Sequence, residues 1–328
     1  MRYYDVFNGD ADGICALHQL RLADPVDSTL VTGLKRDIAL LDSVQAGDGD
    51  LVTVLDVSLD RNRAALERLL EAGAVVHYFD HHFAGDIPSH PRLLSVIDQA
   101  EASCTSALVD RYVGGRFRAW AVVGAFGDEA GDLAANLARP LGLDAARVDA
   151  LHELGASLNY SAYGQSEADV LVLAADLYGI VSHYADPFEL AASEPIIERL
   201  GVERRADLER ALESRPLRET PRADAWMLPD APWARRVSGT FANRLGQSAP
   251  HRAHAVLTPR SDGGYVVSVR SPRSSGATAV ELCRRFPTGG GRALAAGIDR
   301  LEDSRLGEFL DALCATWPSD GASLGIAS

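Results

Sequence analysis

Four short acidic segments follow one another along the first part of the chain, and a glycine run follows near its end. They are Asn8-Gly9-Asp10-Ala11-Asp12-Gly13, Leu55-Asp56-Val57-Ser58, Asp80-His81-His82, Gly127-Asp128-Glu129 and, last, Gly289-Gly290-Gly291-Arg292. Oxygen-rich ligation with one imidazole suits Mn²⁺ or Mg²⁺ better than a metal that favours thiolates. Together the segments predict a pair of hard cations and a loop that approaches a phosphate, which is the chemistry of metal-assisted phosphate ester hydrolysis.

Each acidic segment has a simpler structural interpretation when it is taken alone. Asp10 and Asp12 lie beside glycines, so they fit an Asx turn that caps a helix. That interpretation weakens because Asp56 and Asp128 come after other predicted strands. Several carboxylates that converge on one partly buried edge repel each other strongly unless a cation lies between them.

The Asp80-His81-His82 segment is the sharpest local signal, because it directly follows an apolar run. A single histidine at a strand end is usually structural, but two adjacent histidines after an aspartate favour contact with a metal or a phosphate. One ring can ligate the metal while the other donates to a phosphate oxygen, and Asp80 can orient an imidazole from behind.

The elements that must position these residues alternate between strands and helices. The pattern predicts strands over 3–7, 51–55 and 75–79, helices over 13–22, 61–72 and 103–112, and a further apolar run over 119–126. Such alternation is typical of right-handed crossovers and a mostly parallel sheet. The acidic segments all come after apolar runs, and ligands of open α/β sheets bind outside the carboxyl ends of the strands. We therefore expect the acidic side chains at one edge of an α/β domain.

The second half of the chain predicts a smaller α/β domain. After a helical region over 145–184, residues 203–232 are richer in charge and proline. Helices are then expected over 234–245, 278–286 and 306–317, with strands over 253–257 and 265–269. The predicted organisation is a catalytic metal-binding domain over 1–190, a linker over 191–232, a substrate-binding domain over 233–318 and a flexible tail over 319–328. The active site is expected in the cleft between the two domains.

Phosphate contacts are predicted in this second domain. The three glycines Gly289, Gly290 and Gly291 let backbone N–H groups approach an anion closely, although a simple turn is the plainer alternative. Arg292 behind them and Arg270 at a strand end can each fork onto a phosphate, and Ser271 can assist.

Composition narrows the classes of function. The 328 residues carry a net charge of −14, which argues against a sequence-independent grip on long nucleic acid. Lys35 is the only lysine, so the phosphate loop that ends in Gly-Lys-Ser/Thr is absent. The few scattered cysteines suit a reducing compartment, and no apolar run approaches the roughly 20 residues that span a bilayer. We therefore expect a cytoplasmic protein without a membrane partner.

The ordered motifs resemble those of a DHH superfamily phosphoesterase with its DHH-associated C-terminal domain, of the nanoRNase or oligoribonuclease-like kind. The four acidic segments match motifs one to four. Residues 267–271 (Val-Ser-Val-Arg-Ser), the glycine run and Ala295-Ala296-Gly297 resemble the C-terminal substrate-binding signature. The resemblance covers nearly the whole chain, least firmly in its middle.

The resemblance implies two metal ions, usually Mn²⁺ with Mg²⁺ as the alternative. It places Asp10 and Asp56 on one ion and Asp12, Asp56, His81 and Asp128 on the other, with His82 on the scissile phosphate and a metal-activated water as nucleophile. Two positions depart from the pattern. Many members carry a histidine where this chain has Val6, so the first metal site is expected either to be weaker or to be completed by Asn8 or water. Arg292 stands where a histidine usually follows the glycines, and a guanidinium binds phosphate but does not act as an acid near neutral pH.

Within the superfamily, the acidic charge and the motif set favour short oligoribonucleotides or linear dinucleotides, hydrolysed to mononucleotides, with no long nucleic acid as a stable partner. Two enzymatic alternatives keep the same metal ligands: a phosphatase for a small nucleotide of the 3′-phosphoadenylate type, and a cyclic-dinucleotide phosphodiesterase. A non-enzymatic alternative is a nucleotide-binding protein whose metal site is impaired by Val6. The sequence leaves a homodimer open.

Overall fold

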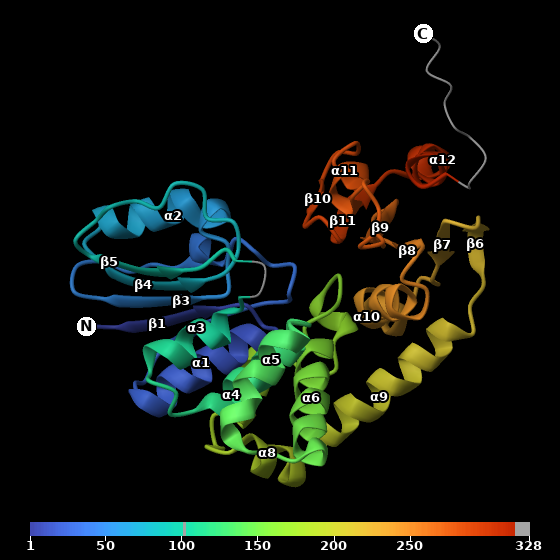
Figure 1. Cartoon of the computed structure of the whole chain (residues 1–328). Helices are drawn as coiled ribbons and strands as arrows, with labels where there is room; N and C mark the ends of the chain where they lie inside the picture. Colours follow the sequence, from blue (N-terminus) through green and yellow to red (C-terminus); the bar gives the residue numbers. More distant parts are fainter. Residues whose placement is uncertain (101–102, 319–328) are drawn as a thin grey trace. The chain divides into compact units, whose positions relative to one another are not determined.

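The structure is a computed structural model that describes residues 1–100 and 103–318. The chain divides into two compact units, Met1–Glu203 and Arg204–Ser328. Figure 1 shows the first unit in blue to yellow-green and the second in yellow to red. The tail that the sequence predicts over 319–328 lies outside the described residues.

The first unit contains one five-stranded sheet. Its strands are β1 (Tyr3–Phe7), β2 (Thr29–Val31), β3 (Leu51–Leu55), β4 (Val75–Asp80) and β5 (Leu93–Ile97). They lie in the order β2-β1-β3-β4-β5, and every pair is parallel. The central strands are almost wholly buried apolar runs, as expected for a sheet covered on both faces. The predicted α/β class with a mostly parallel sheet is confirmed.

Helices cover both faces of this sheet. Figure 1 shows α2 (Leu59–Glu71) on one face, and α1 (Ala11–Ala23) and α3 (Thr105–Tyr112) on the other. The remaining helices of the unit are α4 (Arg118–Gly127), α5 (Gly131–Ala138), α6 (Ala145–Tyr160), α7 (Ala174–Val181) and α8 (Pro187–Ser193), with 3₁₀ turns η1 (Leu40–Ser43), η2 (Arg139–Leu141) and η3 (Glu167–Asp169). The carboxyl ends of β1, β3 and β4 lead directly into the acidic segments.

The sequence predicts that each acidic segment follows a strand, but the apolar run over 119–126, which precedes Asp128, is not a strand. It forms helix α4, and Asp128 is the residue that caps this helix. The run is rich in alanine and glycine, and closely packed neighbours, among them α1, α3 and α6, surround it. Tertiary packing of small residues, which a short apolar run does not reveal by itself, selects the helix.

Gly127 and Gly155 allow α4 to lie unusually close to its neighbours. A Cβ atom on Gly127 would lie 2.3 Å from the Cβ of Ala11, and one on Gly155 would lie 2.4 Å from the carbonyl oxygen of Val123. Both contacts are shorter than any real Cβ tolerates. The close approach sets the position of the α4 end, and therefore of Asp128, relative to the start of α1.

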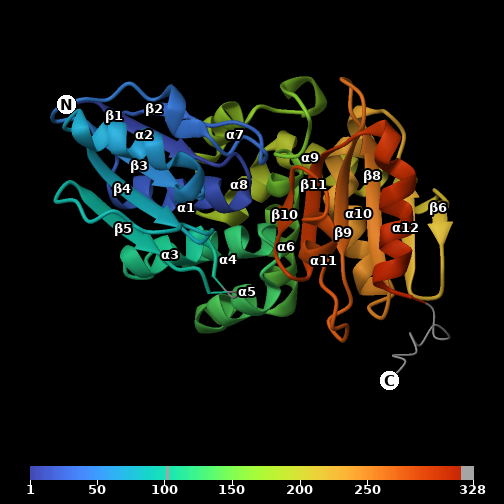
Figure 2. The same cartoon turned by 90° about the horizontal axis from the view of Figure 1, so that it is seen from above.

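The second unit contains a mixed six-stranded sheet. Its strands are β6 (Pro216–Glu219), β7 (Ala223–Met227), β8 (Ala253–Pro259), β9 (Tyr265–Arg270), β10 (Gly289–Gly291) and β11 (Ala295–Leu301). The order is β10-β11-β9-β8-β7-β6, with only β7 and β8 parallel to each other. Figure 2 shows β10, β11, β9 and β8 in this order. Helix α10 (Pro232–Ser248) contacts β8 and β9, α11 (Ala279–Cys283) contacts β11, and α12 (Leu306–Thr316) contacts β7 after the 3₁₀ turn η4 (Asp303–Arg305).

The predicted linker over 191–232 is wrong. This segment forms the long helix α9 (Pro195–Leu212) and then strands β6 and β7, which belong to the second sheet. The charged residues of the segment lie on a half-exposed helix, and Ala223 and Ala225 of β7 are fully buried in the core of the second unit. Charge and proline content indicated exposure, but exposure is equally compatible with a surface helix and an edge strand.

The glycine run is part of the sheet and not a free turn. Gly289–Gly291 pairs antiparallel with β11, with Gly290 opposite Gly297. A Cβ on Gly289 would lie 1.8 Å from the carbonyl oxygen of Cys283, so only glycine allows this strand to pass the end of α11. Within the residues that the structure describes, no helix is long and apolar enough to cross a membrane.

We expect Gly127→Ala to destabilise the protein by about 1–3 kcal/mol, because the added methyl group overpacks the α1–α4 contact. Gly179→Ala in α7 is the matched control, since nothing lies within 4 Å of its added Cβ. The control substitution should stabilise the protein by about 0.4–1 kcal/mol, because alanine favours a helix over glycine. Urea unfolding of the three proteins measures both changes, and equal stabilities would contradict the packing argument.

Candidate metal centre

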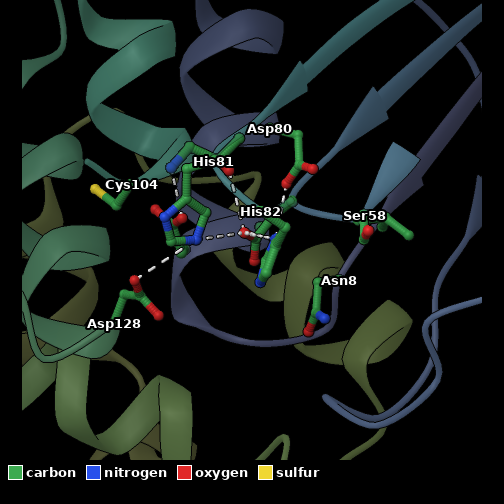
Figure 3. Close-up of polar contacts among 12 residues, drawn as sticks. Asn8, Ser58, Asp80, His81, His82, Cys104 and Asp128 are labelled. Atoms are coloured by element: carbon green, nitrogen blue, oxygen red, sulfur yellow. Dashed lines mark hydrogen bonds and ion pairs between the residues drawn. The ribbon is translucent and has the colours of Figure 1, made fainter. Parts of the chain in front are cut away.

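The polar side chains of the acidic segments meet at the carboxyl edge of the first sheet. Asn8 and Asp10 follow β1, Asp56 follows β3, and Asp80, His81 and His82 end or follow β4. Asp12 lies in the first turn of α1, and Asp128 ends α4. Figure 3 shows His81 and His82 side by side, with Asp128 facing the His81 ring. The structure thus brings together every catalytic and metal-binding side chain that the sequence predicts for the first domain.

His81 lies at the middle of this group. Its Nδ1 donates to the carbonyl oxygen of Ser103 over 2.7 Å, so Nε2 is the nitrogen that carries the lone pair when the imidazole is neutral. Nε2 is buried and makes no hydrogen bond to any described residue, although it lies 3.4 Å from Asp56 Oδ1 and 3.6 Å from Asp128 Oδ2. A buried nitrogen without a hydrogen bond is unusual, and a role as a metal ligand accounts for it.

Asp12 is held in place by the start of helix α3. Its Oδ2 accepts from the backbone N–H of Thr105 over 2.7 Å, and its Oδ1 accepts from that of Ser106 over 2.8 Å. These N–H groups have no partner inside the helix, and the positive end of the helix dipole favours the carboxylate. The contact fixes the Asp12 carboxylate beside His81 and Asp128, and ligand atoms of the three residues lie within 4.8 Å of one another.

Asp56 adopts an uncommon backbone conformation at the end of β3. Its φ angle is 60°, in the left-handed region that non-glycine residues rarely occupy. Its Oδ1 accepts from the hydroxyl of Thr105 over 3.1 Å. Strain of this type persists where the surrounding structure enforces it, and it is common at functional sites. Here it turns a carboxylate toward His81.

His82 is placed differently from His81. Its Nδ1 donates to Asp80 Oδ1 over 2.8 Å, and its side chain is 39% exposed. His82 also belongs to a candidate ligand group with Asp56 and His81, but the Nδ1 that lies 3.8 Å from Asp56 is already bonded to Asp80. The ring is therefore oriented by Asp80 and remains accessible, which suits contact with a substrate better than ligation.

Asp10 has a different environment from the other carboxylates. Its Oδ1 caps α1 by accepting from the N–H groups of Asp12 and Gly13. Its Oδ2 accepts from Lys35 Nζ over 2.6 Å, and the same ammonium lies 3.8 Å from Asp128 Oδ1. The candidate metal-ligand groups among the described residues do not include Asp10.

The charges in this small volume shift one another's pKa values. Burial raises the pKa of Asp56 well above its ordinary value, and the neighbouring charges of Asp10 and Asp12 raise it further. Burial would lower the pKa of His81, but the electrostatic interaction with Asp56 and the charge of Asp128 raise it to about 10. Burial would raise the pKa of Asp10, but Lys35 and the capping hydrogen bonds lower it to about 2. Asp10 is therefore ionised at neutral pH, whereas Asp56 and His81 hold protons in the metal-free protein.

Two overlapping donor sets share His81, whose Nε2 makes no hydrogen bond to the described residues. Asp12 and Asp128 form one set with it, and Asp56 and His82 form the other, with Asp56 Oδ1 3.4 Å from Nε2. Three carboxylates and one imidazole suit Mn²⁺ or Mg²⁺, and the Ser103 carbonyl fixes the ring tautomer that ligation requires.

The predicted phosphate contacts of the second unit gather at one end of its sheet. Arg270 ends β9 opposite Ala295, and the Ser271 hydroxyl donates to the carbonyl oxygen of Ala293. Arg270 Nε donates to Asn243 Oδ1, so this guanidinium is partly engaged within the unit. Arg292 is exposed at the turn between β10 and β11 and carries no described side-chain partner. Their substrate-binding role stays a prediction.

Lys35, Ser103 and Thr105 contribute to the centre although they lie outside the acidic motifs, and the sequence favours a helix-capping or helix-face role for Ser103 and Thr105. The loop after β2 carries Lys35, and the segment before α3 carries Ser103 and Thr105. The sequence contains one signal for Lys35, which is the only lysine of the chain among many arginines. Composition bias is the plainer explanation of this pattern, but an ammonium and a guanidinium are not interchangeable at a bonded site.

No known protein-family model matches this chain, and no curated protein matches it. Solved structures do match. RecJ from Thermus thermophilus, in complex with Mn²⁺, is 19% identical with a TM-score of 0.65, over 97% of this chain and 52% of the RecJ chain. This chain thus spans about half the length of that structure.

Two further solved structures match along most of their own length. A DHH domain from a member of a family of ribosomal proteins is 16% identical, with a TM-score of 0.64 over 96% of this chain and 86% of its own. A pGpG-specific phosphodiesterase, PggH from Vibrio cholerae, is 19% identical, with a TM-score of 0.57 over 96% of this chain and 98% of its own. The chain therefore has the fold of the DHH superfamily, as the motif resemblance implied.

We expect Mn²⁺ binding to tighten as the pH rises from 6 to 8. A metal ion requires a neutral imidazole and ionised carboxylates, whereas His81 and Asp56 hold protons in the metal-free protein because their pKa values are raised. Protons therefore compete with the ion, and the dissociation constant should fall by about tenfold per pH unit for each proton released.

Isothermal titration calorimetry measures this effect. Titrations at one pH in two buffers with different ionisation enthalpies give the number of protons released per ion. We expect at least one proton. A proton count near zero, with an affinity that does not change with pH, would contradict the charge state assigned to His81.

Proposed function

We propose that this chain is a divalent-metal-dependent phosphodiesterase that hydrolyses short oligoribonucleotides or linear dinucleotides to mononucleotides. The observation that carries the proposal is the buried, unpartnered Nε2 of His81 among the carboxylates of Asp12, Asp56 and Asp128. Mn²⁺ is the preferred ion and Mg²⁺ the alternative, since both favour oxygen ligands. The structures of RecJ contain Mn²⁺ or Mg²⁺.

When bound, a divalent cation lowers the barrier to phosphate ester hydrolysis by polarising a phosphoryl oxygen and by acidifying the attacking water. The protein's part is to keep the ligands aligned before the ion arrives. The N–H groups of Thr105 and Ser106 hold Asp12, and the Ser103 carbonyl holds His81. Prearranged ligands of this kind avoid reorganisation during the reaction.

His82 is the proposed contact for the scissile phosphate. Asp80 accepts from its Nδ1, so Nε2 is the nitrogen left to bond a substrate oxygen. The 39% exposure of the side chain allows a substrate to reach it, whereas His81 is buried. In this proposal His81 binds the metal and His82 contacts the phosphate.

Two observations support a small nucleotide over a long one. The net charge of −14 opposes binding along an extended phosphate backbone. The similarity to the pGpG-specific phosphodiesterase extends over nearly the whole of both chains, whereas the RecJ chain is almost twice as long as the part that matches. Because these identities are below one fifth, they support the proposal through the shared fold and not through a shared substrate.

A digestion panel with Mn²⁺ tests the proposal. It includes linear pGpG, cyclic dinucleotides, RNAs of two to about ten nucleotides, the matching DNAs and 3′-phosphoadenylate, with products separated by chromatography. We expect the dinucleotides and the shortest RNAs to disappear first, with release of mononucleotides. Preferential release of phosphate from 3′-phosphoadenylate would replace this proposal with the metabolite phosphatase.

Asp56→Asn is the matched inactive control for this panel. Asparagine tolerates the left-handed backbone conformation of Asp56, so the substitution removes the charge and keeps the local geometry. Activity should fall by about 100-fold or more, since even outer partners of metal ligands are worth about 10–100-fold. If the variant retains full activity, the hydrolysis arises elsewhere, in the protein or in a contaminant.

We expect Arg292→Ala to raise KM for a dinucleotide by about tenfold or more and to change kcat little, because a charge-assisted bond to phosphate is worth about 1.5–3 kcal/mol. Arg300→Ala is the control, since this guanidinium on β11 is already paired with Asp262 and Glu302. Steady-state kinetics of both variants measure the difference. Equal KM values for Arg292→Ala and the wild type would remove Arg292 from substrate binding.

A further inference from the structure

Lys35 Nζ bonds the carboxylate of Asp10, which the two-ion arrangement implied by the motifs would give to a metal. That arrangement needs an ion bound by Asp10 and Asp56. In the structure the Lys35 ammonium bonds Asp10 Oδ2 over 2.6 Å and lies 3.8 Å from Asp128 Oδ1. We infer that Lys35 replaces one of the two cations, so that the centre binds a single divalent ion, held by Asp12, Asp56, His81 and Asp128.

The carboxylate of Asp10 has no free oxygen for a metal. Its Oδ1 accepts from the N–H groups of Asp12 and Gly13, and its Oδ2 accepts from Lys35. A Mg²⁺ ion would have to lie about 2.0–2.1 Å from the same oxygen and therefore against the ammonium. Two positive charges at that separation repel each other strongly in a buried site.

Val6 removes a further ligand from this position. The residue lies on β1 and is fully buried in the apolar cluster of the first unit, together with side chains such as Val54 and Leu59. It offers no donor atom. The remaining nearby donor, Asn8, is already bonded through both ends of its amide: Oδ1 accepts from the N–H of Asp10, and Nδ2 donates to the carbonyl oxygen of Lys35.

The loop that carries Lys35 is built to hold it there. The backbone N–H of Lys35 donates to the carbonyl oxygen of Ala162 over 3.0 Å, and Asn8 bonds its carbonyl oxygen. The Tyr163 ring lies 5.7 Å from Nζ, within the range of a cation–π interaction. Gly9 allows the loop to come this close, because a Cβ there would lie 2.0 Å from the Gly33 carbonyl oxygen. Both backbone groups of Lys35 are therefore hydrogen-bonded, and this fixes the position from which its side chain reaches Asp10.

The inference concerns the same site as the proposed function and rests on it for the identity of the ion, but its test counts ions and needs no substrate. Metal-free protein is dialysed to equilibrium against Mn²⁺, and bound manganese per chain is measured by mass spectrometry. The electron paramagnetic resonance spectrum then distinguishes an isolated ion from an exchange-coupled pair. We expect one ion per chain with the hyperfine pattern of an isolated Mn²⁺. Two ions per chain with a coupled spectrum would overturn the inference.

Lys35→Ala tests whether the ammonium is the cause. Removing it frees Asp10 Oδ2 and opens space beside Asp128, so we expect the variant to bind a second ion. Arg118→Ala is the matched control, because Arg118 pairs with the buried Asp110 and its side chain is 31% exposed, against 30% for Lys35. The control should stay at one ion per chain. Circular dichroism confirms that each variant is folded.

The outcomes separate the two proposals. A folded Lys35→Ala variant that still binds one ion would overturn the role of Lys35. Two ions in the wild type would overturn the inference and leave the proposed phosphodiesterase intact. No bound ion in a folded wild type would overturn the inference and the proposed function together.

Discussion

Four carboxylates, those of Asp10, Asp12, Asp56 and Asp128, share a small and largely buried volume at the carboxyl edge of the first sheet. Such a group is unfavourable unless positive charge or hydrogen-bond donors compensate it. The architecture of the first unit can be understood as a set of such compensations. The start of α3 donates two N–H groups to Asp12, the start of α1 donates two to Asp10, and Thr105 donates its hydroxyl to Asp56.

These compensations also explain why so many elements converge with tight tolerances. Asp128 reaches the group only because α4 approaches α1 closely enough that Gly127 has no room for a Cβ atom. Asp56 reaches it through a left-handed backbone conformation. Close packing and local strain thus hold together carboxylates that repel one another. Burial of the apolar side chains of the first unit offsets this unfavourable free energy.

The sequence predicted the parts of this centre that depend on local pattern. Asp56 and the Asp80-His81-His82 segment follow buried strands, and their placement follows from the rule that parallel strands present their carboxyl ends together. Asp128 was expected after a strand, but it ends a helix, because an apolar run of this length fits either element until its neighbours are known. The segment over 191–232 was missed for a related reason: a charged surface helix and an edge strand resemble a linker in composition. The contact between Lys35 and Asp10 joins two loops 25 residues apart, and no periodicity encodes it.

The centre uses two different means to balance its negative charge, and the difference bears on how it would work. Around His81 and Asp56, protons compensate the charge in the metal-free protein, and an ion can displace them because they are exchangeable. Beside Asp10, the ammonium of Lys35 compensates the negative charge. Because this ammonium is covalently attached to the chain, neither dilution nor a chelator removes it. Asp10 therefore stays ionised and keeps α1 capped whether or not metal is bound. A fixed charge at one position and an exchangeable one at the other would make the fold independent of metal while the chemistry depends on it.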